Sequence, residues 1–354
     1  MYLKNLTVKN FRNHDYGKYE FSNKMNILVG ENGAGKTNLA EAIYYLSLAR
    51  SFRTQDDTEL LRYGHYEAYI DAKVMTGEIS HKIKVVFSPE GRKIIIDNKP
   101  VRKISELSKL VNIIIFEPKD VMLFRGLPKE RRNYLDVNIS KKSVAYLGYI
   151  SQYEKLLKER NTLLKQEKID ETLLQTLTEM LIKLSGPIVS YRQQYCQDVN
   201  DVLNKIIRAL TSERMCAKMI YQPFVPYDDE FENHATQAFK RALEGDIKKK
   251  VTSIGVHRED FQMTLNGKDI ASFGSQGENR MVAIALKLSP FFLIEDKDKR
   301  PIIICDDIMS ELDQDHQKRL INFLKKFEQV FITATNLSVD DALTYVLTKR
   351  KERN

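Results

Sequence analysis

One stretch near the N-terminus, Gly30-Glu-Asn-Gly-Ala-Gly-Lys-Thr37, limits the possible folds more than any other part of the chain. It has the form G-x-x-x-x-G-K-T, which is the phosphate-binding P-loop. The apolar run before it, residues 25–29, is typical of a short buried strand, and the periodic run after it, residues 38–48, is typical of a helix. Strand, glycine loop and helix are the context that this motif requires. The sequence therefore predicts a binding site for a nucleoside triphosphate.

The residue types of this loop suit the binding of phosphate. Its glycines allow a tight turn that directs backbone N–H groups at phosphate oxygens, and the following helix points its positive end at the same anion. Lys36 is expected to reach the β- and γ-phosphates and to act in catalysis, while the Thr37 hydroxyl is expected to bind Mg²⁺. ATP and Mg²⁺ are therefore the predicted cofactors. The predicted ATP contacts in this segment are Gly30, Glu31, Asn32, Gly33, Ala34, Gly35, Lys36, Thr37 and Asn38.

The composition is that of a soluble globular protein. The chain has 354 residues, of which 42% are hydrophobic and 29% charged. Its formal net charge of +8 favours an anionic partner such as nucleic acid. No apolar run approaches the roughly 20 residues that span a bilayer, and the first residues lack the apolar core of a signal peptide. Because the three cysteines are far apart and have no metal-binding spacing, we expect a reduced, cytoplasmic protein without a membrane partner.

The pattern of predicted elements changes twice along the chain. The first part is rich in strands and includes a hairpin with its turn at residues 88–91. A mostly helical part covers about residues 129–243, where Gly186-Pro187 is expected to break or kink a helix. A mixed pattern then returns, with a hairpin turn at Asn266-Gly267. We predict an ATPase domain in two parts that share one sheet, interrupted by a helical insertion: residues 1–125, 126–245 and 246–354.

A second phosphate-related pattern lies in the last third of the chain. Ile302-Ile-Ile-Cys-Asp-Asp307 places two carboxylates at the end of an apolar strand, which is the Walker B pattern. Asp306 is expected to hold the metal ion, and Asp307 to orient or deprotonate the attacking water. The pattern is weak alone, because apolar strands often end in aspartate. Together with the P-loop it indicates a nucleotide-hydrolysing site.

A third motif, Ser275-Gln-Gly-Glu278, separates classes of P-loop protein. A hydroxyl side chain and a glycine at a helix N-terminus form a second phosphate-binding surface, although a serine there can also be a simple N-cap. The order P-loop, signature, Walker B is typical of ABC ATPases, in which this signature binds the γ-phosphate held by the other subunit. Ser310–Asp313 resembles the D-loop of that class, and Thr333–Thr335 stands where ABC transporters place a switch histidine. The signature residues predicted to contact ATP are Ser275, Gln276, Gly277 and Glu278.

Nearly the whole sequence resembles the RecF family of DNA-repair ATPases, which are related to the heads of SMC proteins. The resemblance implies an α/β fold, an ABC-type P-loop ATPase head with an inserted, mainly helical second domain. Two positions differ from the usual family pattern, Val256 in place of proline and Glu278 in place of glutamine, and neither removes a phosphate-binding group. The segments that carry the resemblance are 6–13, 30–42, 50–54, 116–120, 126–136, 253–260, 275–280 and 306–313.

The resemblance implies that the protein forms an ATP-driven homodimer, which binds double-stranded DNA near single-strand gaps. In this family the protein works with RecR and RecO and promotes loading of the RecA recombinase. Each ATP would be held by Lys36 of one chain and Ser275 of the other, and slow hydrolysis would reset the dimer. Arg12 would contact the nucleotide phosphates. His257 and Arg258, near the signature, are expected to be structural.

Contact with DNA is expected to involve phosphates with little sequence preference, because no base-reading motif is visible. A basic run at residues 349–353 is expected to be a frayed tail. The candidate DNA-binding residues are Arg53, Arg92, Lys93, Lys129, Arg131, Arg132, Lys248, Lys249 and Lys250.

Three other functions remain open from the sequence. An ATP-binding structural DNA clamp would not hydrolyse ATP, and the intact Asp306–Asp307 pair argues against it. A small-molecule P-loop kinase would have no use for residues 275–278. A transporter ATPase subunit would need a membrane partner and would usually have the switch histidine.

Overall fold

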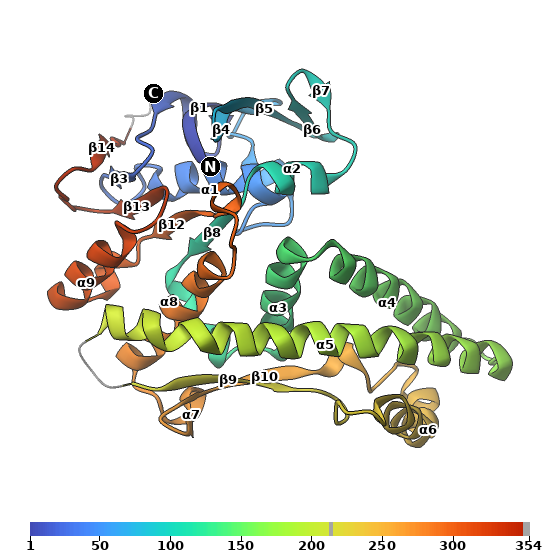
Figure 1. Ribbon diagram of the computed structural model, residues 1–354. Coiled ribbons are helices and arrows are strands. Elements are labelled where there is room, and N and C mark those ends of the chain that lie inside the picture. Colours follow the sequence, from blue (N-terminus) through green and yellow to red (C-terminus); the bar gives the residue numbers. More distant parts are fainter. Residues whose placement is uncertain (212–214, 350–354) are drawn as a thin grey trace. The chain divides into compact units, whose positions relative to one another are not determined.

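A computed structural model describes residues 1–211 and 215–349 of the chain (Figure 1). The chain forms two compact units, each described here by itself. The first unit comprises Met1–Asp120, Arg208–Ser212 and Phe291–Asn354, and the second comprises Val121–Ile207 and Glu213–Pro290. Residues 350–353 of the predicted basic tail lie outside the described residues. In the described residues, no helix combines the length and the apolar character that crossing a membrane requires.

A parallel sheet of five strands forms the centre of the first unit, in the order β14-β3-β13-β12-β8. Its central strands are almost entirely buried apolar runs, as expected for parallel strands covered on both faces. Because β3 pairs with β13, segments from both ends of the chain share this sheet, as predicted. The strands are β3 (Met25–Val29), β8 (Ile113–Phe116), β12 (Ile302–Asp306), β13 (Val330–Ala334) and β14 (Leu343–Val346), with helices α1 (Lys36–Leu48) and α9 (Gln314–Leu324).

A second sheet of the first unit is antiparallel, in the order β2-β1-β4-β5-β6-β7. Its residues alternate between a buried inner face, such as Leu6, Ile70 and Val85, and an outer face of partly exposed side chains. The predicted hairpin is confirmed as β5–β6, with Ser88 paired to Gly91. The strands are β1 (Tyr2–Phe11), β2 (His14–Glu20), β4 (Ala68–Thr76), β5 (Ile79–Ser88), β6 (Gly91–Ile96) and β7 (Lys99–Pro100), with η1 (Asp57–Leu60) and α2 (Ile104–Leu110) nearby in sequence.

The second unit is mainly helical, with a small sheet in the order β11-β10-β9. The predicted turn at Asn266-Gly267 is confirmed, since both residues have positive φ and join β10 to β11. Strand β9 was not predicted, because it is short and lies within the helical pattern. The elements are α3 (Pro128–Lys142), α4 (Val144–Leu163), α5 (Glu171–Leu210), β9 (Ala217–Gln222), α6 (Phe231–Lys249), β10 (Asp260–Leu265), β11 (Lys268–Asp269), α7 (Ile270–Phe273) and α8 (Gln276–Phe292).

Helix α5 continues through Gly186 and Pro187, so of the predicted break or kink the break does not occur (Figure 1). A proline inside a helix costs about 3 kcal/mol. The neighbouring side chains of Leu181, Ile188 and Val189 are fully buried, and each buried aliphatic side chain contributes about 1.5–3 kcal/mol. Burial on this helix face therefore outweighs the cost of the proline.

The compact units differ from the predicted domain boundaries at three places: residues 121–125 fall in the second unit, residues 208–212 fall in the first, and the largest difference lies at the start of the predicted C-terminal part. Residues 246–290 group with the second unit and not with the ATPase sheet. The reason is strand pairing, since β10 is hydrogen-bonded to β9 along its whole length. The signature motif is therefore carried by the second unit, while the P-loop and Walker B strand belong to the first.

Buried ion pairs hold the segment around residues 253–260 within the second unit. Arg192 donates to Asp136 and to Glu259 at 2.8 Å each, and Glu259 also accepts a hydrogen bond from Tyr221. His257 is bonded to Tyr153 and to the Thr252 carbonyl, and burial lowers its pKa to about 4. A histidine that stays neutral in a buried network is consistent with a structural role.

Candidate functional site: a P-loop with Walker B, and a separate signature loop

The P-loop is held in place by the residues that connect β1 to β2. Asn13 donates to the Gly33 carbonyl, and His14 bonds the Gly35 carbonyl, both at 3.1 Å. Gly35 has φ of 97°, and a Cβ there would lie 2.8 Å from side-chain atoms of Asn13 and His14. Only glycine fits this close approach. The loop is therefore supported from its own unit before any nucleotide binds.

The Lys36 side chain folds back over the loop that precedes it. Its ammonium group donates to the carbonyls of Gly30 at 2.6 Å and Glu31 at 3.0 Å, and the residue is 8% exposed. Gly35 precedes α1 and has no side chain to cap the first N–H groups of the helix. These donors and the ammonium group suit an anion at the same point.

Walker B lies beside the P-loop helix, and a hydroxyl–carboxylate pair joins them. Thr37 Oγ1 donates to Asp306 Oδ1 at 3.1 Å, and Thr333 Oγ1 donates to the same oxygen at 2.7 Å. Burial raises the pKa of Asp306, and the hydrogen bonds from Thr333 and Thr37 oppose this effect. Mg²⁺ prefers oxygen ligands about 2.1 Å away in an octahedron. The Thr37 and Asp306 oxygens fit two neighbouring positions of such an ion.

Asp307 has a backbone conformation that few non-glycine residues adopt. Its φ is 53°, in the left-handed region. Its N–H donates to Thr333 Oγ1 at 2.9 Å, and its carbonyl accepts from Ser310 Oγ at 2.8 Å. These bonds fix the turn after β12, and such constrained backbone is common at functional sites. The threonine at the switch position thus supports both Walker B aspartates.

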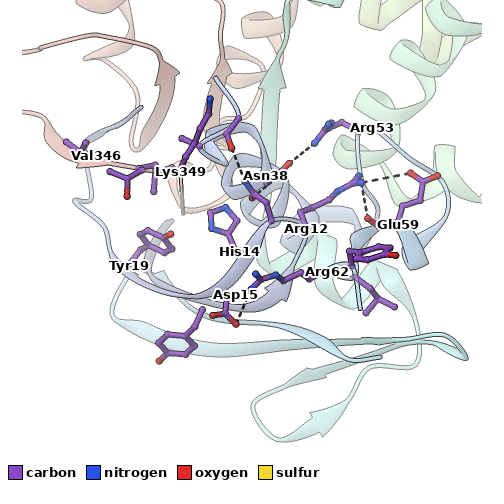
Figure 2. A pocket seen from close by; sticks show the side chains of 18 residues that line it. Arg12, His14, Asp15, Tyr19, Asn38, Arg53, Glu59, Arg62, Val346 and Lys349 are labelled. Carbon is purple, nitrogen blue, oxygen red and sulfur yellow. Dashed lines mark hydrogen bonds and ion pairs between the residues drawn. The ribbon is translucent and has the colours of Figure 1, made fainter. Parts of the chain in front are cut away.

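Two arginines lie against α1 at the edge of this site (Figure 2). Arg12 makes two hydrogen bonds, of 2.9 and 2.8 Å, to the fully buried carboxylate of Glu41. Arg53 donates to Asn38 at 2.7 Å and lies 3.4 Å from Glu41. The sequence placed Arg53 among DNA contacts, but the structure places it beside the P-loop helix, where its charge lowers the pKa of Asp306. A motif search could not assign this position, because the arginine is isolated in the sequence.

A hollow of about 1550 Å³ opens next to the P-loop within the first unit (Figure 2). It exceeds the usual volume of a small-molecule site. Arg12, His14 and Asn38 lie on its wall together with residues Val346–Lys349, at the end of β14 and just after it. The exposed rings of Tyr16 and Tyr63 also line it. Sequence analysis did not find these tyrosines, because tyrosine is common in ordinary strands.

The signature forms a closed capping box at the start of α8. The Ser275 N–H donates to Glu278 Oε2 at 2.7 Å, and the Glu278 N–H donates to Ser275 Oγ at 3.2 Å. The N-cap role that the sequence left open is therefore present. Ser275, Gln276 and Gly277 are nevertheless exposed, and a Cβ on Gly277 would meet no atom within 4 Å. The surface at the N-terminus of α8 is therefore accessible to a ligand.

The loop before the signature is fixed by two side chains of the second unit. Arg125 donates to the carbonyls of Ala271 at 3.0 Å and Gly274 at 3.4 Å. Asn279, which is 2% exposed, donates to the carbonyls of Gly274 and Ser275. A Cβ on Gly274 would lie 2.7 Å from Asn279 and Ile270. No sequence pattern indicates this role for Arg125, because its partners are distant in the chain.

Several predicted DNA-binding arginines are engaged inside their own unit. Arg131 forms a two-point ion pair with Asp260, at 2.7 and 2.8 Å, and Arg132 donates to the Glu259 carbonyl at 2.7 Å. Arg92 is bonded to Asp57 at 2.5 Å and to Tyr45 at 3.0 Å. The charges of these three arginines are therefore already engaged by partners in their own units. The lysines among the candidates that remain exposed are Lys93, Lys129, Lys248, Lys249 and Lys250.

Comparison with known proteins identifies relatives that cover nearly the whole chain. A family model described as the RecF/RecN/SMC N terminal domain matches residues 2–353. The DNA replication and repair protein RecF of Bacillus subtilis (strain 168) is 35% identical over 351 residues, which is 95% of this chain and 94% of that protein.

Solved structures agree with this relationship. A structure of the recombination mediator protein RecF-ATP in the RecFOR pathway matches with a TM-score of 0.87 and 32% identity, over 97% of this chain and 95% of that chain. The Smc head domain of Pyrococcus furiosus, bound to the C-terminal domain of ScpA, matches with a TM-score of 0.57 and 17% identity, over 95% of this chain and 90% of that chain. The second similarity concerns the fold alone.

Proposed function

Because the chain belongs to the RecF family of RecF/RecN/SMC-type ATPases, we propose that it is an ATP-dependent DNA-binding protein of recombinational repair and replication restart. The observation that carries this proposal is the bonded set of Thr37, Asp306 and Thr333 beside a pre-formed P-loop. That set is what phosphoryl transfer from ATP requires near the β- and γ-phosphates. A relative was solved as RecF-ATP, which supports ATP as the nucleotide.

The proposed chemistry assigns one task to each residue of the site. Bound Mg²⁺ would neutralise charge on the β- and γ-phosphate oxygens. Thr37 and Asp306 would hold this ion, and Lys36 would leave the loop carbonyls to contact the phosphates. Asp307 would orient the attacking water, and the exposed rings of Tyr16 and Tyr63 would face the nucleoside end of the hollow. Arg12, held by Glu41, would border the phosphates.

A composite site would couple this chemistry to DNA. In a homodimer, the exposed Ser275–Gly277 surface of one chain would meet the ATP held by the P-loop of the partner copy. A lone subunit then lacks part of its site, so ATP binding favours association. The closed dimer would bind double-stranded DNA near gaps and act with RecR and RecO to promote RecA loading. A relative solved as the recombination mediator protein RecF-ATP in the RecFOR pathway supports these partners.

Slow hydrolysis would open the dimer and release the DNA. Asp307 is one methylene shorter than the glutamate common in transporters, which favours slow turnover as a timing step. A turnover of tens per second by the purified protein would contradict this part of the proposal.

The decisive experiment is sedimentation of the wild type and of Ser275→Arg, with and without ATP, each with a short DNA duplex. The wild type should dimerise and bind duplex only with ATP. The variant should bind ATP normally but stay monomeric, because the arginine fills the open surface beside Gly277. Thr236→Arg, an equally exposed change on α6 of the same unit, is the control and should behave as the wild type.

Two outcomes would contradict the proposal. If the wild type binds ATP but neither dimerises nor binds duplex, the composite site fails and a small-molecule phosphoryl acceptor becomes the function to test. If dimer and DNA complex form but ATP is never hydrolysed, the protein is an ATP-binding structural clamp.

A further inference from the structure

The outer face of the antiparallel sheet in the first unit carries lysines from five adjacent strands. Alternation along β4 and β5, and along Leu6–Lys9 of β1, separates this face from the inner one, whose residues are buried in the core. We propose that this face, called the lysine face, binds the phosphate backbone of double-stranded DNA, and this inference rests on the proposed function. The lysine face consists of Lys9, Lys18, Lys73, Lys82, Lys84 and Lys93.

The strand register places these lysines in rows across the sheet. Lys9, Tyr69, Val86 and Lys93 form one row, because each pairs with the next across neighbouring strands. In another row Lys73 lies directly opposite Lys82. With neighbouring strands about 4.8 Å apart, the five strands span about 19 Å. The lysines therefore cover a broad surface and do not form a single line.

Positive charge on this face is only partly balanced. Lys82 pairs with Asp71 at 3.4 Å, and Lys84 lies over the Tyr69 ring at 5.2 Å. Glu20 is a second carboxylate on the face, and Asp97 at its edge is bonded to His81. Within residues 1–211 and 215–349 the structure gives no ion pair to the other four lysines of the face, Lys9, Lys18, Lys73 and Lys93.

The placement of Lys73 opposite Lys82 needs a physical reason. Like charges that face each other across strands are destabilising, by a fraction of a kcal/mol. A bound polyanion removes this repulsion and replaces it with favourable contacts. Lysine ammonium groups bind phosphate as point charges, without selecting a base. A sheet surface of this kind matches the regular charge of a DNA backbone and predicts binding without sequence preference.

The test is a triple charge reversal, Lys9→Glu/Lys73→Glu/Lys93→Glu. The matched control is Lys318→Glu/Lys325→Glu/Lys326→Glu, which changes three exposed lysines of the same unit, on α9 and the residues after it, by the same total charge. Duplex affinity with ATP is measured over a range of salt concentrations. Each neutralised phosphate contributes about 0.9 to the slope of log affinity against log salt, so the face variant should lose about 2 to 3 from this slope. At moderate salt its affinity should fall at least about tenfold, and the control's by much less.

Separate readouts keep the inference distinct from the proposed function. ATP affinity, ATP-dependent dimerisation and the unfolding temperature should match the wild type in both variants. If the face variant keeps the control's affinity and salt slope while the wild type binds duplex with ATP, only the lysine face is refuted. If the wild type itself fails to bind duplex, the proposed function falls and the lysine face with it. Lys9→Gln/Lys73→Gln/Lys93→Gln replaces the first variant if the added carboxylates impair folding. Its duplex affinity and salt slope should fall in the same direction, but by less.

Discussion

Two helix N-termini carry the motifs that are predicted to bind phosphate, and they are built in opposite ways. At α1 the loop is supported by Asn13 and His14, the helix has no side-chain cap, and the lysine and hydroxyl side chains are bonded into the site. At α8 the serine caps its own helix, and the motif residues 275–277 are exposed. The first site is prepared to hold a nucleotide by itself. The second is a rigid, open surface that its own unit does not complete.

The charges in the first turns of α1 and α8 also differ, and they too favour anion binding at α1. The first turn of α1 contains no acidic residue, so its positive end is available to an anion. The first turn of α8 contains Glu278, whose carboxylate already occupies the N–H of Ser275. An anion at α8 must compete with this charge. The signature should therefore bind phosphate weakly alone and become effective only when a nucleotide is presented by another chain.

Replacing Lys36 with alanine removes the strongest cation of the first site and should have the largest effect. A hydrogen bond to a charged group contributes about 1.5–3 kcal/mol, so ATP affinity should fall about 10- to 100-fold. Titration calorimetry with ATP measures this loss. Lys318→Ala is the control, because this exposed lysine lies on α9 of the same unit and outside the P-loop, and it should leave the affinity nearly unchanged. Equal losses in both variants would mean that the loop attracts ATP by general charge and that the two helix starts differ little.

The motifs of the first site could be predicted from the sequence because each of them consists of consecutive residues. Gly30 to Thr37, and the apolar strand that ends in Asp306 and Asp307, need no distant partner to be identified. The shared parallel sheet followed from the same logic, since both motifs had to meet. Edge strand β14 was missed because its residues are mostly exposed and show no buried run.

The partners of charged side chains could not be predicted from the sequence. Arg131 looked like a surface cation, yet its partner Asp260 is 129 positions away. Arg53 was likewise predicted to contact DNA, and its hydrogen bond to Asn38 could not be foreseen. Charge and spacing do not distinguish a solvated arginine from a paired one, because the pairing is created by tertiary contacts. The lysine face became visible only through strand register, which places residues 9 and 93 in one row.

Substitution of Glu278 with glutamine sharpens the comparison at the second site. Glutamine at this position can still close the capping box, but the negative charge at the start of α8 disappears. A charge at a helix end contributes about 0.3–1 kcal/mol, so the ATP-dependent dimer should tighten about two- to fivefold. Sedimentation at several protein concentrations measures this change. Glu232→Gln, in the exposed first turn of α6, is the control and should leave dimerisation unchanged. A weaker dimer in Glu278→Gln would contradict the expectation and would show that the carboxylate takes part in binding.

Thr333→Val tests how the first site keeps the carboxylate of Asp306 charged. Burial raises the pKa of Asp306, and the Thr333 hydrogen bond is the largest opposing influence. Removing that hydroxyl must raise this pKa further, because a hydrogen bond to the charged form is lost. Metal binding needs the ionised carboxylate, so the acidic limb of ATPase activity should move to higher pH, with a loss of less than about threefold at neutral pH.

The same substitution leaves the Asp307 N–H without its acceptor, which should lower the free energy of unfolding by about 1–2 kcal/mol. Thr335→Val, an exposed threonine two positions further on, should change neither property. An unchanged acidic limb in Thr333→Val, with the expected loss of stability, would mean that Thr333 supports the turn after β12 but does not set the charge of Asp306. In that case the N-termini of α1 and α8 would differ only in how their backbone groups are arranged, and not in the ionisation of a carboxylate. A shift of the limb, by contrast, would extend the difference between the two sites to ionisation, because at the second site the Glu278 carboxylate accepts from the Ser275 backbone N–H, and the Ser275 hydroxyl oxygen accepts from the Glu278 N–H.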